Sequence, residues 1–202
     1  MGLVRVGVIG VGVLGQHHAR LYRECPDSEL VGIHDSNPVS AQTAAAEFET
    51  TAFATIDELV DAVDAVSIAV PTTLHHAIAT DLLQRGCHVL VEKPLAATVE
   101  EGRELVALAQ RNKLTLHVGH VERYNPVITY LEQRVDNPRF IESHRLASYP
   151  PLRPGMLPRG TEVGVVLDLM IHDIDIILHL VNSEIERVDA VGIPVLSPTE
   201  DI

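Results

Sequence analysis

Short apolar runs recur through the first 120 residues, and stretches of helical character separate them. Several of these runs are apolar throughout, as strands covered on both faces of a sheet are. The five runs predicted as strands cover residues 4–10, 29–35, 65–70, 88–93 and 114–120. This alternation of strands and helices predicts right-handed βαβ units, and therefore a doubly wound parallel sheet of the α/β class.

The segments between these runs carry signals for helix starts and stops. Each signal is an N-cap residue, a capping-box pair or a terminating glycine. They are Asn37-Pro38, Thr55 before Asp57 and Glu58, Thr98 with Glu101, and Gly86 after a helix that begins near Thr73. Helices are therefore predicted in the intervals that a βαβ arrangement requires.

The pattern changes after residue 120, where we place a domain boundary. Residues 1–120 are predicted to form the sheet domain, and residues 121–202 the start of an α+β domain for substrate binding and oligomerisation. The second segment combines a short helix, two strand-like runs and a proline-rich loop. In chain order these are the helix after Asn125-Pro126, the strand 139–146, the loop 149–160 and the strand 186–195. With so few strands, the second domain is expected to be incomplete.

A long helix is predicted over residues 165–181, where twelve residues are aliphatic or methionine. That composition is typical of a fully buried helix, yet the segment also contains five ionisable residues: Asp168, His172, Asp173, Asp175 and His179. At about 100° per residue, all of these except Asp173 fall within roughly 60° of one another. Because unpaired buried charge is costly, this stripe predicts either an internal hydrogen-bond network or a ligand cavity. A metal site is a third hypothesis, because His and Asp four residues apart can share a metal ion, but no second pair of ligands lies nearby in the sequence.

Composition narrows the class of protein. Twenty-eight acidic and fifteen basic residues give a formal charge of −13, which disfavours binding to nucleic acid or to an anionic membrane. Hydrophobic residues make up 46% of the chain and aromatic residues 3%, so the core must be aliphatic. No uncharged run approaches the roughly 20 residues of a membrane span, and Cys25 and Cys87 form no metal or disulfide pattern. Together with an N-terminus unlike a signal peptide, these features predict a cytoplasmic protein.

A glycine-rich turn follows the first predicted strand and opens a helix. It reads Gly10-Val-Gly12-Val-Leu-Gly15, the spacing of a dinucleotide fingerprint. In such a turn Gly10 permits the tight bend, Gly12 lets backbone N–H groups approach a pyrophosphate, and Gly15 lets the helix pack closely on the strand. We therefore predict a Rossmann domain whose cofactor contacts include this turn, with Val13 and Leu14.

Asp35 closes the second predicted strand, twenty positions after Gly15. A carboxylate there accepts hydrogen bonds from the adenosine ribose and repels a 2′-phosphate, so Asp35 favours NAD over NADP. The same residue also fits a turn before Asn37-Pro38. Because S-adenosylmethionine enzymes combine a similar turn and acid, these residues alone leave the cofactor open.

Two further groups of residues follow predicted strands, at the edge where a doubly wound sheet binds its ligands. Val70, Pro71, Thr72 and His75 lie at and just beyond the end of one strand, and Glu92-Lys93-Pro94 lies at the end of another. We expect the first group, Glu92 and Lys93 to contact the cofactor. Taken alone, a charged pair after a strand is more typical of a solvated strand end.

Four segments, in their order and spacing, resemble the Gfo/Idh/MocA oxidoreductase family over essentially the whole chain. The segments are the glycine turn, VPTTLHH (70–76), VEKPLAAT (91–98) and DLMIHDID (168–175). The most specific combination is the EKP triplet with DxxxH more than seventy residues later. GHVERYNP (119–126) and the later helix are similar to the branch that contains UDP-N-acetylglucosamine 3-dehydrogenases of lipid A sugar synthesis.

This resemblance implies an oxidoreductase whose sugar site, beside the nicotinamide, is lined by Lys93, Asp168 and His172. Oxidation of a secondary alcohol requires hydride transfer to the cofactor and a base near the hydroxyl proton. His172 can accept that proton and Lys93 can stabilise the developing alkoxide, but the sequence leaves open which of the two is the base. Asp168 would orient the His172 ring or bind a neighbouring sugar hydroxyl.

Residues at the domain junction are also expected to bind substrate. The resemblance places His120, Arg123 and Asn125 near the nicotinamide and the sugar, and Arg123 suits a sugar-nucleotide phosphate. A hinge with an Asn-Pro helix cap explains the same residues equally well.

The remaining candidate features are two further residues of the long helix and the proline-rich loop. Asp175 shares the ionisable stripe and is assigned to the substrate site, whereas His179 is expected to be structural. The loop 149–160, which contains Arg153 and Arg159, either covers the substrate or is a plain connection.

The favoured hypothesis is an NAD-dependent enzyme that oxidises a sugar, at the 3-hydroxyl of a UDP-amino sugar. Two alternatives remain open: an NAD-dependent glycoside hydrolase with transient oxidation, and a non-catalytic NAD-responsive binding module. A methyltransferase is disfavoured because the EKP triplet and the later helix would then have no role. Family members are longer, so the chain is expected to end within its second domain and to form a homo-oligomer in its full-length form.

Overall fold

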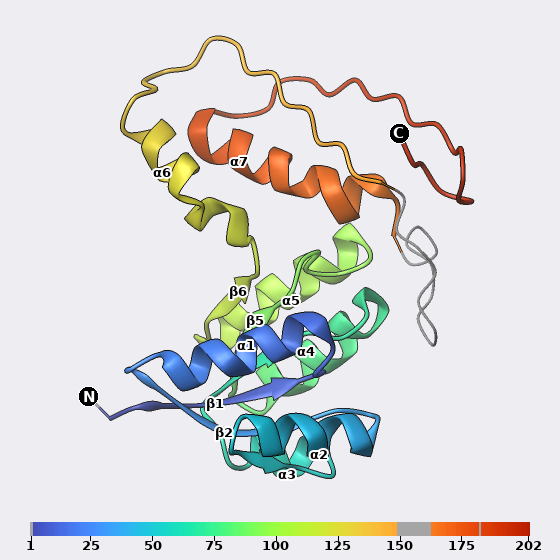
Figure 1. Ribbon diagram of the computed structural model, residues 1–202. Coiled ribbons are helices and arrows are strands. Elements are labelled where there is room, and N and C mark those ends of the chain that lie inside the picture. Colours follow the sequence, from blue (N-terminus) through green and yellow to red (C-terminus); the bar gives the residue numbers. More distant parts are fainter. Residues whose placement is uncertain (1, 149–162, 182) are drawn as a thin grey trace. The chain divides into compact units, whose positions relative to one another are not determined.

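The computed structural model describes residues 2–148, 163–181 and 183–202. Contacts divide the chain into two compact units, Met1–Gly119 and His120–Ile202. The division falls beside the boundary expected near residue 120. The first unit contains both helices and strands, and the described part of the second contains helices and irregular segments (Figure 1).

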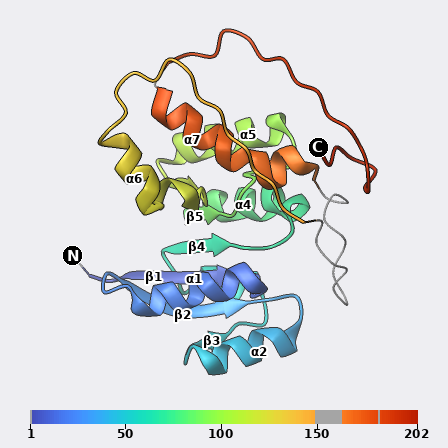
Figure 2. The ribbon, with the colours of Figure 1, turned by 45° about the horizontal axis from the view of Figure 1, so that its top comes forward.

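The first unit is built on a six-stranded parallel sheet with the strand order β3-β2-β1-β4-β5-β6 (Figure 2). Its strands are β1 Val4–Ile9, β2 Ser28–His34, β3 Thr51–Ala52, β4 Ala65–Ile68, β5 His88–Val91 and β6 Leu116–Val118. This topology confirms the predicted Rossmann fold and its five predicted strands. The sequence does not predict strand β3, because two residues are too few to show the alternation of side chains typical of a strand. Their pairing with Gly32 and Ile33 makes them a strand.

Helices connect the strands and begin where the capping signals predict. They are α1 Val13–Glu24, α2 Pro38–Glu47, α3 Ile56–Val60, the short 3₁₀ helix η1 Thr72–Leu74, α4 His75–Gln84 and α5 Val99–Asn112. The Asn37 side chain accepts N–H groups at the start of α2, and Thr55 and Thr98 each form a complete capping box. Gly86, two residues beyond α4, has a φ of +84°, a conformation that favours glycine.

Two hydrophobic clusters hold these helices on the sheet. Successive residues of a strand point to opposite faces, and accordingly Val8 belongs to one cluster and Ile9 to the other. The cluster around Val8 includes Ala19 of α1, and the cluster around Ile9 includes Leu82 of α4 and Leu105 of α5. The sheet is thus covered on both faces, as its apolar strands predict.

The described part of the second unit is helical where it is regular. Its helices are η2 Val121–Tyr124, α6 Pro126–Glu132, the π-helical η3 Val166–Met170 and α7 Ile171–Val181. The short helix after Asn125-Pro126 is confirmed, whereas the strands predicted at 139–146 and 186–195 are wrong, because both segments are irregular. A strand needs a neighbour for its backbone hydrogen bonds, and alternation of side chains does not supply one. The predicted loop 149–160 lies outside the described residues.

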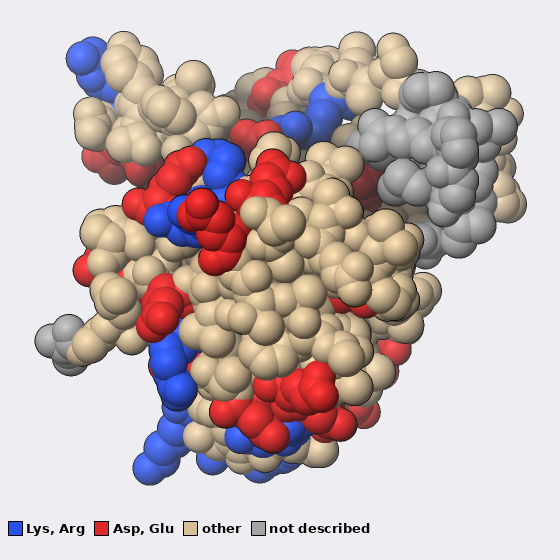
Figure 3. Space-filling view, turned by 60° about the horizontal axis from the view of Figure 1, so that its bottom comes forward, with Lys and Arg blue, Asp and Glu red and all other residues tan. Residues whose placement is uncertain are grey.

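The surface carries charges of both signs. On the face drawn in Figure 3, Lys and Arg side chains lie in small groups beside Asp and Glu side chains. No helix among the described residues is long and apolar enough to cross a membrane.

Candidate cofactor-binding and active site

The predicted cofactor residues gather along one edge of the sheet. Parallel strands run in the same direction, so the carboxyl ends of β1, β2, β4 and β5 lie along the same edge. Each of these ends leads into one predicted group: the glycine turn, Asp35, Val70-Pro71-Thr72 and Glu92-Lys93. The fold therefore brings together four distant parts of the chain where doubly wound sheets bind their ligands.

The glycine turn between β1 and α1 leaves an open cradle beside a helix N-terminus. Gly10 has a φ of +86°, and a Cβ there would lie 2.6 Å from the carbonyl oxygen of Ala69. A Cβ on Gly15 would lie 1.8 Å from the carbonyl oxygen of Gly10. At Gly12, by contrast, no described atom comes within 4 Å of such a Cβ. Because Gly12 caps α1 without a side-chain hydrogen bond, the first N–H groups of the helix suit an anion such as a pyrophosphate.

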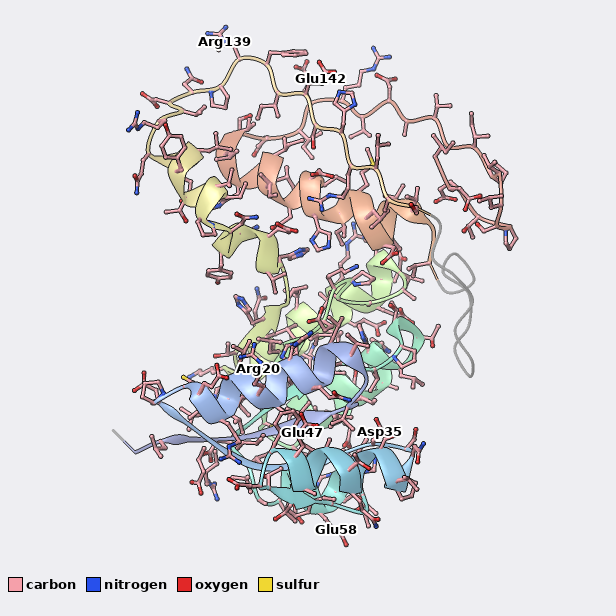
Figure 4. All side chains as sticks on the ribbon, viewed as in Figure 1. Arg20, Asp35, Glu47, Glu58, Arg139 and Glu142 are labelled. Carbon is pink, nitrogen blue, oxygen red and sulfur yellow. The ribbon has the colours of Figure 1, made fainter. Side chains whose placement is uncertain are left out.

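Asp35 is fixed beside this turn by two backbone groups (Figure 4). Its Oδ2 accepts the N–H of Val11 at 2.8 Å, and its Oδ1 accepts the N–H of Asn37 at 2.8 Å. A carboxylate oxygen has more than one lone pair, so both oxygens can still accept a hydroxyl hydrogen. The geometry is therefore compatible with Asp35 as a turn residue and as a ribose ligand at the same time.

His75 joins two of the loops at this edge. Its ring is 1% exposed, with Nε2 lying 2.9 Å from the carbonyl oxygen of Val70 and Nδ1 lying 2.8 Å from that of Pro94. The ring thus ties the loop after β4 to the loop after β5. Cofactor binding by Val70, Pro71, Thr72 and His75 stays a prediction, and for His75 this burial favours an indirect role through the two loops.

Glu92 and Lys93 directly follow β5, where Glu92 is buried and Lys93 is half-buried. Glu92 is 7% exposed, and its Oε1 lies 2.8 Å from Nε2 of His18 on α1. Its Oε2 accepts the backbone N–H of Lys93 at 3.2 Å. Burial alone would raise the pKa of the Glu92 carboxyl, but the hydrogen bond from His18 and the charges of His18 and Lys93 hold that pKa below its ordinary value. Glu92 is therefore an anchored carboxylate beside Lys93 and differs from a solvated strand end.

In the second unit, bidentate ion pairs hold two of the ionisable residues of α7. Arg123 donates from Nε and Nη2 to the two oxygens of Asp175, at 2.7 and 2.6 Å. Arg145 donates in the same way to Asp173, at 2.8 and 3.1 Å. Burial would raise the pKa of Asp175, but the Arg123 hydrogen bond and the nearby charge of His120 keep it lowered, and the Arg145 hydrogen bond lowers the pKa of Asp173. Sequence reasoning missed Arg145, which no local pattern links to Asp173.

The expectation of a fully buried helix over 165–181 is wrong. Met170 is 52% exposed, Ile174 38% and Leu178 44%. The segment is also not uniform, because η3 is π-helical and α7 is α-helical. A π-helical turn is wider than an α-helical one, so the stripe predicted with α-helical pitch applies only to the residues of α7.

Three ionisable residues of this segment pair with charged side chains, as the hydrogen-bond network interpretation expects. Asp173 and Asp175 form the arginine pairs, and His179 pairs with Glu132 of α6. Asp168 lies within η3, and His172 follows at the start of α7. The change from π-helix to α-helix thus falls at these two residues, and their role in the sugar site stays a prediction.

The junction residues also take defined positions in the second unit. Asn125 caps α6 by accepting the N–H of Val127 at 3.0 Å, as the hinge interpretation expects. Nδ1 of His120 lies 3.9 Å from Oδ2 of Asp175. Substrate binding by His120, Arg123, Asn125 and Asp175 stays a prediction. Among the residues that the structure describes, no group of three His, Cys, Asp or Glu side chains is arranged to hold a metal ion.

A comparison with protein families agrees with the geometry of the sheet edge. Residues 4–120 match the family described as "Oxidoreductase family, NAD-binding Rossmann fold". The chain belongs to the Gfo/Idh/MocA family. Its first unit is accordingly the NAD(P)-binding Rossmann domain of this family, and the glycine turn and Asp35 occupy the positions typical of dinucleotide binding.

One Gfo/Idh/MocA relative aligns with both units. UDP-N-acetylglucosamine 3-dehydrogenase of Acidithiobacillus ferrooxidans is 41% identical over 200 residues, which are 98% of this chain and 61% of the relative. A solved structure of that enzyme matches with a TM-score of 0.89 over 100% of this chain and 64% of that chain. The chain therefore spans about three fifths of the length of this curated relative.

Other solved structures of this fold contain nicotinamide cofactors of both kinds. GenD2 from gentamicin A biosynthesis, solved with NAD, is 29% identical with a TM-score of 0.64, over 66% of this chain and 39% of that chain. Biliverdin reductase from Synechocystis sp. PCC 6803, solved with biliverdin and NADP⁺, is 34% identical with a TM-score of 0.60, over 65% of this chain and 42% of that chain. Similarity alone therefore does not choose between NAD and NADP.

Proposed function

We propose that this protein is an NAD-dependent oxidoreductase that transfers a hydride between the 3-hydroxyl carbon of a UDP-amino sugar and the nicotinamide. The observation that carries the proposal is the sheet edge itself, where the dinucleotide turn, Asp35 and Lys93 lie together. The choice of sugar rests on the 41% identity to a UDP-N-acetylglucosamine 3-dehydrogenase, which extends over both units. The resemblance of residues 119–126 and of the later helix to the branch of lipid A sugar synthesis adds that the reaction would serve that synthesis, in the cytoplasm.

The cradle at Gly12 fits a dinucleotide. The N–H groups at the start of α1 would bind its pyrophosphate, and a side chain at position 12 would fill the same space. The free lone pairs of Asp35 would accept the two ribose hydroxyl hydrogens. When bound, NAD supplies the acceptor for the hydride.

In this proposal Lys93 and His172 act on the hydroxyl group that is oxidised. The ammonium group of Lys93 would donate a hydrogen bond to the reacting oxygen and stabilise negative charge as it develops there. His172, or Lys93 in its neutral form, would take the hydroxyl proton, and Asp168 would orient the imidazole or bind a neighbouring hydroxyl. The roles of Asp168 and His172 rest on the family motif DxxxH and on their position at the change from η3 to α7.

Self-association in a homo-oligomer is part of the proposal. In the second unit Phe140 is 82% exposed, Leu146 93% and Val191 90%. In a homo-oligomer of the full-length protein, these exposed apolar side chains would be available to pack against another subunit.

Asp35→Ser is expected to weaken NAD binding about tenfold or more and to leave NADP binding unchanged or stronger. The substitution removes the acceptors for the ribose hydroxyls and the charge that repels a 2′-phosphate. Isothermal titration calorimetry with both cofactors measures the ratio of the two dissociation constants. Asp27→Ser is the matched control, because Asp27 is an exposed acid that precedes the same strand, β2. An unchanged ratio in Asp35→Ser would remove Asp35 from cofactor selection.

An assay of NAD reduction with a panel of UDP-sugars, followed by mass spectrometry of the sugar, tests the reaction. NADH formation with a product two hydrogens lighter is expected for UDP-N-acetylglucosamine. Cleavage of the sugar without net NADH formation would identify a glycoside hydrolase. NAD binding without any chemical change in the panel would favour the binding module and contradict the proposal.

A further inference from the structure

A buried chain of hydrogen bonds leads from helix α1 to the backbone of Lys93. The ring of His18 lies between Ser67 of β4 and Glu92 at the end of β5, with Nδ1 at 3.2 Å from Ser67 Oγ and Nε2 at 2.8 Å from Glu92 Oε1. The Tyr22 hydroxyl, one turn further along α1, lies 2.6 Å from Ser67 Oγ. Ser67 is fully buried, and it is the polar exception in the apolar strand β4.

The carboxylate restricts the protonation of His18. Glu92 can only accept at Oε1, so Nε2 of His18 must carry a hydrogen. A neutral ring with its hydrogen on Nδ1 would face the carboxylate with a lone pair and is excluded. In the neutral form with hydrogen on Nε2, every donor has an acceptor: Tyr22 donates to Ser67, Ser67 to His18, and His18 to Glu92. The imidazolium form keeps both contacts of the ring as well.

Both oxygens of Glu92 are thereby engaged. Oε1 accepts from His18, and Oε2 accepts the backbone N–H of Lys93 at 3.2 Å. The backbone of Gly119 lies close to this carboxylate, since a Cβ added there would lie 3.2 Å from Oε2. A carboxylate held in this way has little freedom to rotate, and it fixes the peptide from which the Lys93 side chain projects.

We propose that His18 is a positioning residue for Lys93 and acts through Glu92. His18 sets the orientation of the carboxylate, and the carboxylate sets the position of the Lys93 backbone at the sheet edge. The consequence for turnover rests on the proposed function of Lys93, whereas the consequence for the Lys93 backbone does not.

Two substitutions separate the two contacts of the His18 ring. The amide nitrogen of glutamine lies about where Nε2 of histidine lies, so His18→Gln retains the contact to Glu92. Asparagine is shorter and reaches about as far as Nδ1, so His18→Asn retains the contact to Ser67 and loses that to Glu92. His17→Asn is the matched control, because His17 is exposed on the same helix.

The composition of the chain makes the Lys93 backbone directly observable. Lysine occurs only at positions 93 and 113, so labelling with ¹⁵N-lysine gives two backbone amide signals, which Lys113→Arg assigns. In His18→Asn the Lys93 signal is expected to move upfield as its hydrogen bond to the carboxylate weakens, while the Lys113 signal stays in place. His18→Gln and His17→Asn are expected to keep both signals near their wild-type positions.

Three spectroscopic outcomes would overturn the proposal. An unmoved Lys93 signal in His18→Asn would mean that Glu92 holds its position without His18. Equal movement in His18→Gln and His18→Asn would assign the effect to general packing. Loss of the folded spectrum in His18→Asn would give His18 a purely structural role.

Turnover with UDP-N-acetylglucosamine tests the link to catalysis. His18→Asn is expected to lower kcat roughly 10- to 100-fold with NAD affinity within about twofold of wild type, and His18→Gln to restore most of the loss. A moved Lys93 signal with unchanged kcat would overturn the catalytic part of the inference. Absence of turnover in the wild-type chain would count against the proposed function, and the amide signals would still decide the role of His18.

Discussion

Lys93→Met is expected to lower kcat roughly 100- to 10,000-fold while the affinity for NAD stays within about twofold of wild type. Methionine keeps an unbranched apolar stem but has neither a charge to stabilise an alkoxide nor a proton to exchange. The backbone contact between Lys93 and Glu92 is independent of the side chain, so the fold of the loop should persist. Steady-state kinetics of NADH formation measures the first quantity, and calorimetric titration with NAD measures the second.

The other lysine of the chain provides the control for this substitution. Lys113 follows α5 as its C-cap, with a φ of +57°, and its side chain is exposed. Lys113→Met makes the same chemical change away from the carboxyl ends of the strands, and its kcat should match that of the wild type. If Lys93→Met retained wild-type turnover, Lys93 would have no part in the chemistry.

Gly15→Ala is expected to unfold the first unit or to destabilise it by more than about 4 kcal/mol, the range that marks severe steric conflict. The added Cβ would lie 1.8 Å from the carbonyl oxygen of Gly10, and backbone on both sides of the contact leaves no flexible side chain to move away. Urea unfolding followed by circular dichroism measures the free energy of unfolding.

Gly12→Ala makes the same change three residues earlier with the opposite expected result. No described atom comes within 4 Å of the added Cβ, so the free energy of unfolding should stay within about 1 kcal/mol of wild type. NAD affinity should nevertheless fall at least about tenfold, because the methyl group occupies the cradle proposed for the pyrophosphate. Wild-type NAD affinity in Gly12→Ala would show that the dinucleotide does not bind at this turn.

The first unit could be predicted well because its signals are local. Apolar runs, the caps at Asn37, Thr55 and Thr98, and the glycine turn each lie within a few residues of what they determine. The prediction of strands at 139–146 and 186–195 was wrong because strand formation depends on a distant partner. A strand exists only with a partner, and the alternation of side chains along one segment contains no information about that partner.

The site residues also divide into those that local signals predict and those that depend on distant contacts. The sheet edge that gathers the glycine turn, Asp35 and Lys93 follows from strand order alone. The contacts of His18 with Ser67 and Glu92 span 49 and 74 positions, and a histidine within a helix has no local signature that indicates them. The one local signal is the polar Ser67 inside an apolar strand, since a buried hydroxyl group requires a hydrogen-bond partner.

The ionisable residues of the segment 165–181 were only partly predictable. Its five ionisable residues predicted partners or a cavity, and charged partners come from distant positions of the chain: Arg123, Arg145 and Glu132. Helical periodicity identified the residues of the stripe, but it could not predict that Arg123, Arg145 and Glu132 would pair with Asp175, Asp173 and His179. The π-helical turn that contains Asp168 was also beyond sequence reasoning, since the pattern assumed a constant α-helical pitch.

Transfer of deuterium from C3 of the sugar to the nicotinamide tests the central claim most directly. UDP-N-acetylglucosamine labelled with deuterium at C3 is incubated with the chain and NAD, and both products are analysed by mass spectrometry. The proposed reaction predicts deuterated NADH and a ketosugar that has lost the label. Unlabelled NADH, or a sugar that keeps its deuterium while NAD stays oxidised, would contradict hydride transfer from that carbon.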